Sequence, residues 1–121
     1  MTLEEFENEV SRVIEELPEE FKVELDNVEF FVEIWPTESD LHSILAHPGT
    51  TLFGLYRGVP KTKRLSSYSA VLPDKITIFA GPIISLSADR EAVRMQIKKT
   101  VLHEIGHYFG MSEESIRSAH Y

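Results

Sequence analysis

Two histidines near the end of the sequence restrict the fold of this chain more than any other feature. His103 and His107 enclose Glu104 in the pattern H-E-x-x-H. Residues four apart in an α-helix lie one turn above each other on the same face, so the two imidazoles can meet at one point if this segment is helical. The segment is therefore expected to be a helix that the rest of the fold supports.

The same spacing is typical of a metal site. Two imidazole nitrogens one turn apart can both bind one Zn²⁺ ion, at about 2.0–2.1 Å. Glu104 lies about 100° around the helix from His103, where its carboxylate can reach a water molecule without binding the ion. The pattern arises by chance in roughly one short chain in a few hundred. We therefore predict that His103 and His107 are metal ligands and that Glu104 is a general base.

We expect a third protein ligand among the fourteen residues that follow His107. Gly110 permits the chain to turn back, because glycine readily takes the left-handed conformation found past helix ends. The first donor beyond it is Glu113, which extends the pattern to H-E-x-x-H-x-x-G-x-x-E. Metzincins have histidine at this position, but zinc also accepts a carboxylate. Glu113 has the better register for the third ligand, and Glu114 is the alternative.

The rest of the sequence predicts a small α+β fold. Thr2 and Glu5 have the form of a capping box, and apolar residues then recur at helical spacing as far as Pro18. Alternating apolar and β-branched residues predict three strands, at 28–34, 51–56 and 75–80. Further helical segments are expected at 41–45, from Ser87 to Gly110, and at 113–117. This order predicts a small β-sheet packed against an active-site helix and an N-terminal helix.

Composition limits the classes of protein to which the chain can belong. No linker or repeat divides its 121 residues, so we expect a single domain over residues 1–121. The absence of cysteine leaves histidine and carboxylate as metal ligands, and a net charge of −8 argues against nucleic-acid binding. The N-terminus is acidic and the longest apolar stretch, 76–84, is too short to cross a bilayer. We therefore expect a cytoplasmic protein that binds no membrane.

Three segments resemble the zincin-like metallopeptidases, a family often called minimal zincins. They are 52–60 (LFGLYRGVP), 72–83 (LPDKITIFAGPI) and 101–110 (VLHEIGHYFG), the last continued through Glu113. The resemblance covers most of the chain and implies a short mixed sheet against the active-site helix, a second helix behind it, and one catalytic-type zinc ion. The family usually carries aspartate at the position of Glu113, which favours a carboxylate as the third ligand.

From these features we expect a zinc-dependent peptidase that uses Glu104 as its base and takes a peptide or protein substrate. Two alternatives stay open: a zinc-bearing module that binds a peptide or partner without turning it over, and an amidase that acts on a non-peptide amide. An extended peptide would pair with a sheet edge beside the helix, and strand 75–80 is the expected edge. Tyr68, Tyr108 and Arg57 are candidate oxyanion donors, among which the sequence does not select. It does not indicate an oligomeric state either.

Overall fold

The computed structural model of the protein describes residues 1–45, 52–58 and 73–119, except for the side chains of 43–45 and 113. Within these ranges it is an α+β fold with one three-stranded mixed sheet, as the sequence predicts. The elements are α1 (Leu3–Glu15), α2 (Glu19–Lys22), η1 (Val23–Leu25), β1 (Val28–Glu33), α3 (Glu38–Leu45), β2 (Gly54–Arg57), β3 (Asp74–Phe79), α4 (Ala80–Leu86), α5 (Arg90–Tyr108) and α6 (Glu113–Ser118). None of the described helices combines the length and the hydropathy needed to cross a membrane.

The sheet has the strand order β1-β3-β2, so the prediction that strand 75–80 forms an edge is wrong. β3 is the central strand: it runs parallel to β1, with Phe30 opposite Ile76, and antiparallel to β2, with Tyr56 opposite Ile76. From Ile76 to Phe79 every residue of β3 is buried. A strand covered on both faces carries such a continuous run of poorly exposed residues. In the described part of the chain, β1 and β2 are therefore the edges.

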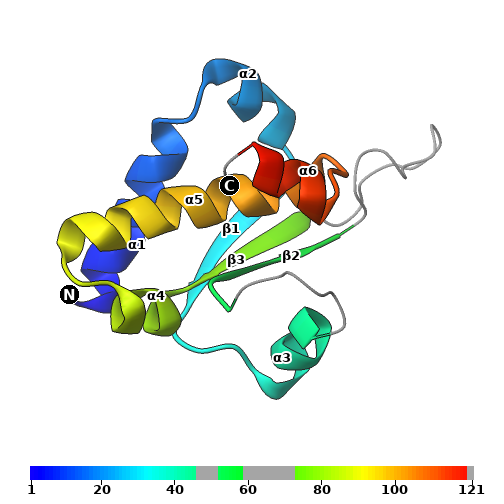
Figure 1. Ribbon diagram of the computed structural model, residues 1–121. Coiled ribbons are helices and arrows are strands. Elements are labelled where there is room, and N and C mark those ends of the chain that lie inside the picture. The colour runs from blue at the N-terminus through cyan, green and yellow to red at the C-terminus, as the bar shows by residue number, and fades with distance from the viewer. Residues whose placement is uncertain (46–51, 59–72, 120–121) are drawn as a thin grey trace.

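Helix α5 lies across one face of the sheet, with α1 beside it (Figure 1). The predicted capping box starts α1: the Glu5 amide donates to Thr2 Oγ1 at 3.1 Å, and the Glu5 carboxylate accepts from the Thr2 amide. The hydrophobic core fills the space between these two helices and the sheet. Its most completely buried members are Phe6, Ile76, Ile78, Ile83, Ile97 and Val101.

Charged side chains join α1 to the first half of α5. Glu9 of α1 is only 4% exposed, and Arg94 of α5 donates to its two carboxylate oxygens at 2.8 and 3.2 Å. This hydrogen bonding lowers the pKa of the Glu9 carboxyl below its ordinary value. Closer to the start of both helices, Arg90 donates to Glu5 at 2.7 Å. The charged pairs fix the position of α1 along α5.

Helix α4 is the main element that the sequence did not indicate. It follows β3 directly, in a segment that contains Gly81 and Pro82 and for which no helix was predicted. Proline is compatible with the first turn of a helix, because its missing amide would have no partner there. The Gly81 amide donates to the carbonyl oxygen of Ile34 at 2.7 Å, and a β carbon at Gly81 would lie 2.6 Å from the Trp35 ring. Glycine thus lets α4 pass close to the end of β1.

Candidate metal centre

The predicted reversal of the chain after α5 is present in the structure. Gly110 has a φ of 83°, in the left-handed region. The Gly110 amide donates to the His107 carbonyl, and the Met111 amide donates to the Gly106 carbonyl, both at 2.9 Å. These two bonds are the Schellman arrangement that ends a helix with glycine. Met111, which follows this turn, is 38% exposed.

The last two turns of α5 bring together the three polar residues of the H-E-x-x-H pattern. Each of His103, Glu104 and His107 offers one ligand atom, and these atoms all lie within 4.8 Å of one another. The two imidazole rings are 5.1 Å apart between centroids, at an angle of 68°. His103 and Glu104 are 5% and 3% exposed, and His107 is partly buried. Two imidazoles and a carboxylate at these separations fit one metal ion of the kind that zinc represents.

Edge strand β2 contacts α5 beside this cluster because its first residue is glycine. A β carbon at Gly54 would lie 2.6 Å from Thr100 Cγ2 and 3.2 Å from Glu104 Cγ. Any larger side chain would therefore push β2 away from the helix or displace Glu104. The sequence gives no local signal for this role, since a glycine at the start of a strand equally fits a turn. Gly54 sets how closely the sheet approaches Glu104.

Helix α6 packs on α5 at a second glycine. Ile116 of α6 is 1% exposed, and a β carbon at Gly106 would lie 2.8 Å from its Cγ1 atom. Ser112 caps α6 by accepting from the Ser115 amide at 3.1 Å. Glu113 is the first residue of α6 and follows the reversal directly, but its side chain lies outside the described part of the chain. Glu113 therefore stays a prediction as the third ligand, with the exposed Glu114 as the alternative.

The two described candidates for an oxyanion donor are engaged elsewhere. The hydroxyl of Tyr108, which is 1% exposed, donates to the carbonyl of Glu24 at 3.0 Å. Arg57 donates to the Asp40 carboxylate at 2.7 Å and so ties β2 to α3. Both side chains serve the fold in this structure. The third candidate, Tyr68, lies outside the described residues.

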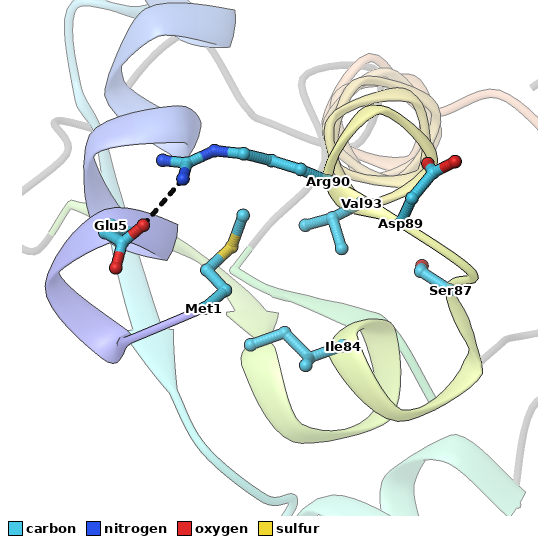
Figure 2. Close-up of a pocket in the computed structure, with 7 residues that line it drawn as sticks. All are labelled: Met1, Glu5, Ile84, Ser87, Asp89, Arg90 and Val93. Carbon is cyan, nitrogen blue, oxygen red and sulfur yellow. Dashed lines mark hydrogen bonds and ion pairs between the residues drawn. The ribbon is translucent and has the colours of Figure 1, made fainter.

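A cavity of about 260 Å³ lies at the opposite end of α5 from the histidines (Figure 2). Its lining residues lie in or next to α1, α4 and the start of α5: Met1, Glu5, Ile84, Ser87, Asp89, Arg90 and Val93. Both of its carboxylates serve helix starts, because Glu5 belongs to the capping box and Asp89 accepts from the Ala92 amide at 2.8 Å. Glu5 also accepts from Arg90. The two carboxylates of this cavity are thus engaged in helix capping and in an ion pair.

Comparison with known proteins gives the family of the chain. A solved structure of a conserved hypothetical protein from Thermus thermophilus is similar, with 25% sequence identity and a TM-score of 0.59 over 98% of this chain and 99% of that chain. No curated protein matches the sequence. The family model described as zincin-like metallopeptidase matches residues 25–121, a span that includes the whole H-E-x-x-H pattern. The chain therefore belongs to the zincin-like metallopeptidase family.

Proposed function

We propose that this protein is a zinc-dependent peptidase, in which His103, His107 and Glu113 bind the ion and Glu104 is the general base. The observation that carries the proposal is the cluster of His103, Glu104 and His107, whose ligand atoms lie within 4.8 Å of one another on one end of α5. The family of the chain supports the same interpretation. When bound, the ion supplies a Lewis acid that polarises a carbonyl group and acidifies a water molecule.

Glu104 moves the proton in this proposal. Its carboxylate accepts a proton from the water that attacks the carbonyl carbon of the peptide bond. As the bond between that carbon and nitrogen breaks, Glu104 passes the proton to the leaving amine. With only 3% of Glu104 exposed, little bulk water competes for the carboxylate, and Gly54 fixes its distance from β2. A buried base next to two imidazoles suits this transfer better than an exposed one.

The position of β2 supports a peptide as the substrate. β2 is an edge strand of the described sheet, and its first residue contacts the helix at Glu104. An extended peptide that pairs with an edge strand gains main-chain hydrogen bonds without requiring a particular sequence. A peptide added to β2 would run past Glu104, which the central strand β3 does not allow. We therefore propose that the peptide substrate pairs with β2 and not with strand 75–80.

One observation favours an alternative, a metal-bearing module that binds a peptide without cleaving it. Tyr108 and Arg57, the described candidates for stabilising an oxyanion, donate to Glu24 and Asp40. A peptidase that lacks such a donor loses a substantial part of its rate enhancement. A zinc amidase that acts on a non-peptide amide would use the same ion and base, so only its substrate distinguishes it from the proposed peptidase.

Cleavage of a diverse peptide library, followed by mass spectrometry, tests the proposal. Zinc-loaded parent protein is compared with Glu104→Gln, which removes the base and keeps the shape of the side chain. Glu91→Gln is the matched control, because it makes the same change at an exposed site in the first turn of α5. We expect the rate to fall about 10²–10⁴-fold in Glu104→Gln alone, with equal zinc content in all three proteins. Zinc-loaded parent that cleaves nothing would favour the binding module or the amidase.

Zinc affinity separates the two candidates for the third ligand. Glu113→Ala and Glu114→Ala are compared with the parent in a competition titration against a coloured chelator. We expect Glu113→Ala to weaken zinc binding by about 100-fold or more. Loss of a residue that only hydrogen-bonds a metal ligand already costs about 10–100-fold in affinity, and loss of a ligand itself should cost more. Glu114→Ala should bind zinc as the parent does. The reverse result would assign the ligand to Glu114.

A further inference from the structure

Gly106 has no side chain beyond a hydrogen atom, yet the packing of α6 depends on it. A β carbon at Gly106 would lie 2.8 Å from Cγ1 and 3.0 Å from Cδ1 of Ile116. Ile116 is 1% exposed, so its side chain has little room to move aside. Glycine inside a helix is less stable than alanine, and its presence in the middle of a turn of α5 indicates that close contact is needed there. Alanine at this position would displace α6.

The segment between the histidines and α6 is short, and hydrogen bonds hold both of its ends. The amides of Gly110 and Met111 close the end of α5, and the Ile116 amide donates to the Ser112 carbonyl at 3.0 Å in the first turn of α6. Such a segment absorbs little movement. A shift of α6 at Ile116 is therefore passed to the start of α6, which lies one turn away at residue 113.

We propose that the contact between Gly106 and Ile116 sets the distance between the start of α6 and the histidines, and through this distance the affinity for zinc. Gly106 and Ile116 are then positioning residues for the third ligand. The inference rests on the proposed zinc site, with its third ligand in the first turn of α6. It adds that two apolar residues, neither of which binds the ion, determine how close the third ligand comes to the two histidines.

A double-mutant cycle tests the contact, with zinc affinity as the readout. Gly106→Ala is expected to bind zinc about 10–100-fold more weakly than the parent, as variants of supporting residues do at other metal sites. Ile116→Ala removes both atoms that the new methyl group would meet. The double variant is therefore expected to bind zinc more tightly than Gly106→Ala alone, so that the two losses are not additive.

Two further readouts separate positioning from a general loss of stability. The thermal midpoint of the metal-free Gly106→Ala protein should stay near that of the parent, because alanine favours the helix while the contact opposes it. The visible spectrum of the cobalt-loaded protein should change in Gly106→Ala and return toward the parent spectrum in the double variant. If Gly106→Ala does not fold, Ile116→Val weakens the same contact and should lower zinc affinity roughly two- to tenfold.

The outcomes distinguish this inference from the proposed function. Unchanged zinc affinity in Gly106→Ala, or losses that simply add in the double variant, would overturn the positioning role while the zinc site stands. A fall in affinity that matches a fall in the stability of the metal-free protein would overturn it as well. A parent protein that binds no zinc would overturn the proposed site and this inference together.

Discussion

A buried glutamate lies near each end of helix α5, Glu9 of α1 near its start and Glu104 of α5 itself near its end, but the partners of the two carboxylates differ. Near the start of α5, Glu9 is 4% exposed and accepts hydrogen bonds from Arg94. Near the end of α5, Glu104 is 3% exposed and its carboxylate lies with the imidazoles of His103 and His107. The first carboxylate faces a permanent cation within the fold. The second lies beside two imidazoles that, in the proposed site, bind a zinc ion.

The packing around the two ends differs in the same way. Ion pairs join the first half of α5 to α1, while apolar core residues lie along both halves of the helix. The second half is approached closely at two glycines, by β2 at Gly54 and by α6 at Gly106. The difference teaches that ion pairs position the first half of the helix against α1, while close approach at glycine shapes the half that carries His103, Glu104 and His107. Changes in the two halves should therefore have separable effects.

The largest expected effect on stability comes from the core between α1 and α5. Phe6 is fully buried, and Phe6→Ala should lower the free energy of unfolding by about 3–5 kcal/mol because it leaves a cavity. Urea denaturation of the metal-free protein measures this change. Zinc affinity of the folded variant should stay within about threefold of the parent, since the mutation is remote from the site. A large loss of zinc affinity in folded Phe6→Ala would show that the two halves are not separable.

The reverse experiment changes the half of α5 that carries the histidines. His103→Gln should weaken zinc binding by about 100-fold or more, because a ligand is lost rather than a supporting residue. His42→Gln makes the same change at an exposed residue of α3 and should leave the affinity unchanged. Chelator competition measures both. Equal affinities of His103→Gln and His42→Gln would contradict the assignment of His103 as a ligand.

A smaller effect is expected where α1 begins. Thr2→Ala removes the side-chain oxygen that accepts from the Glu5 amide at 3.1 Å. Loss of such a cap should lower the free energy of unfolding by about 1 kcal/mol. Thermal melting measures the change, and zinc content should not respond to it. A drop in zinc content alongside the lower melting temperature would indicate that the start of α1 affects the metal site.

The smallest effect concerns acid pH and Glu9. Hydrogen bonds from Arg94 lower the pKa of Glu9 in the folded protein below the ordinary value of 4.5. The resulting stabilisation is present above this ordinary value and is lost as the pH falls through the lower, folded-state pKa. Urea denaturation across the acid range should therefore show a shallower loss of stability in Glu9→Gln than in the parent. Identical pH profiles would mean that Glu9 does not contribute to acid unfolding.

Local sequence signals predicted the parts of the fold that depend on neighbours along the chain. The capping box at Thr2, helix α5 and the reversal at Gly110 all follow from residues within a few positions of each other. The central place of β3 depends on which strands pair with it, and a single strand sequence does not contain that information. Helix α4 was not predicted, because Gly81 and Pro82 are compatible with a break in the chain as well as with the first turn of a helix.

In the candidate site, too, features set by neighbouring residues were predictable and contacts between distant segments were not. Helical spacing was enough to bring His103, Glu104 and His107 together. The two glycine contacts were not predictable, because they depend on the approach of β2 and α6 in the folded protein. The third ligand stays a prediction.

The central claim is that the end of α5 holds one zinc ion with an open position, and a crystal structure of the zinc-loaded protein tests it most directly. Diffraction data from both sides of the zinc absorption edge locate the ion without assumption. We predict one anomalous peak, bonded to the imidazoles of His103 and His107 at about 2.0–2.1 Å and to a carboxylate from the start of α6, with a fourth position left to solvent. No peak between the two imidazoles, or an ion closed off by four protein ligands, would contradict the account.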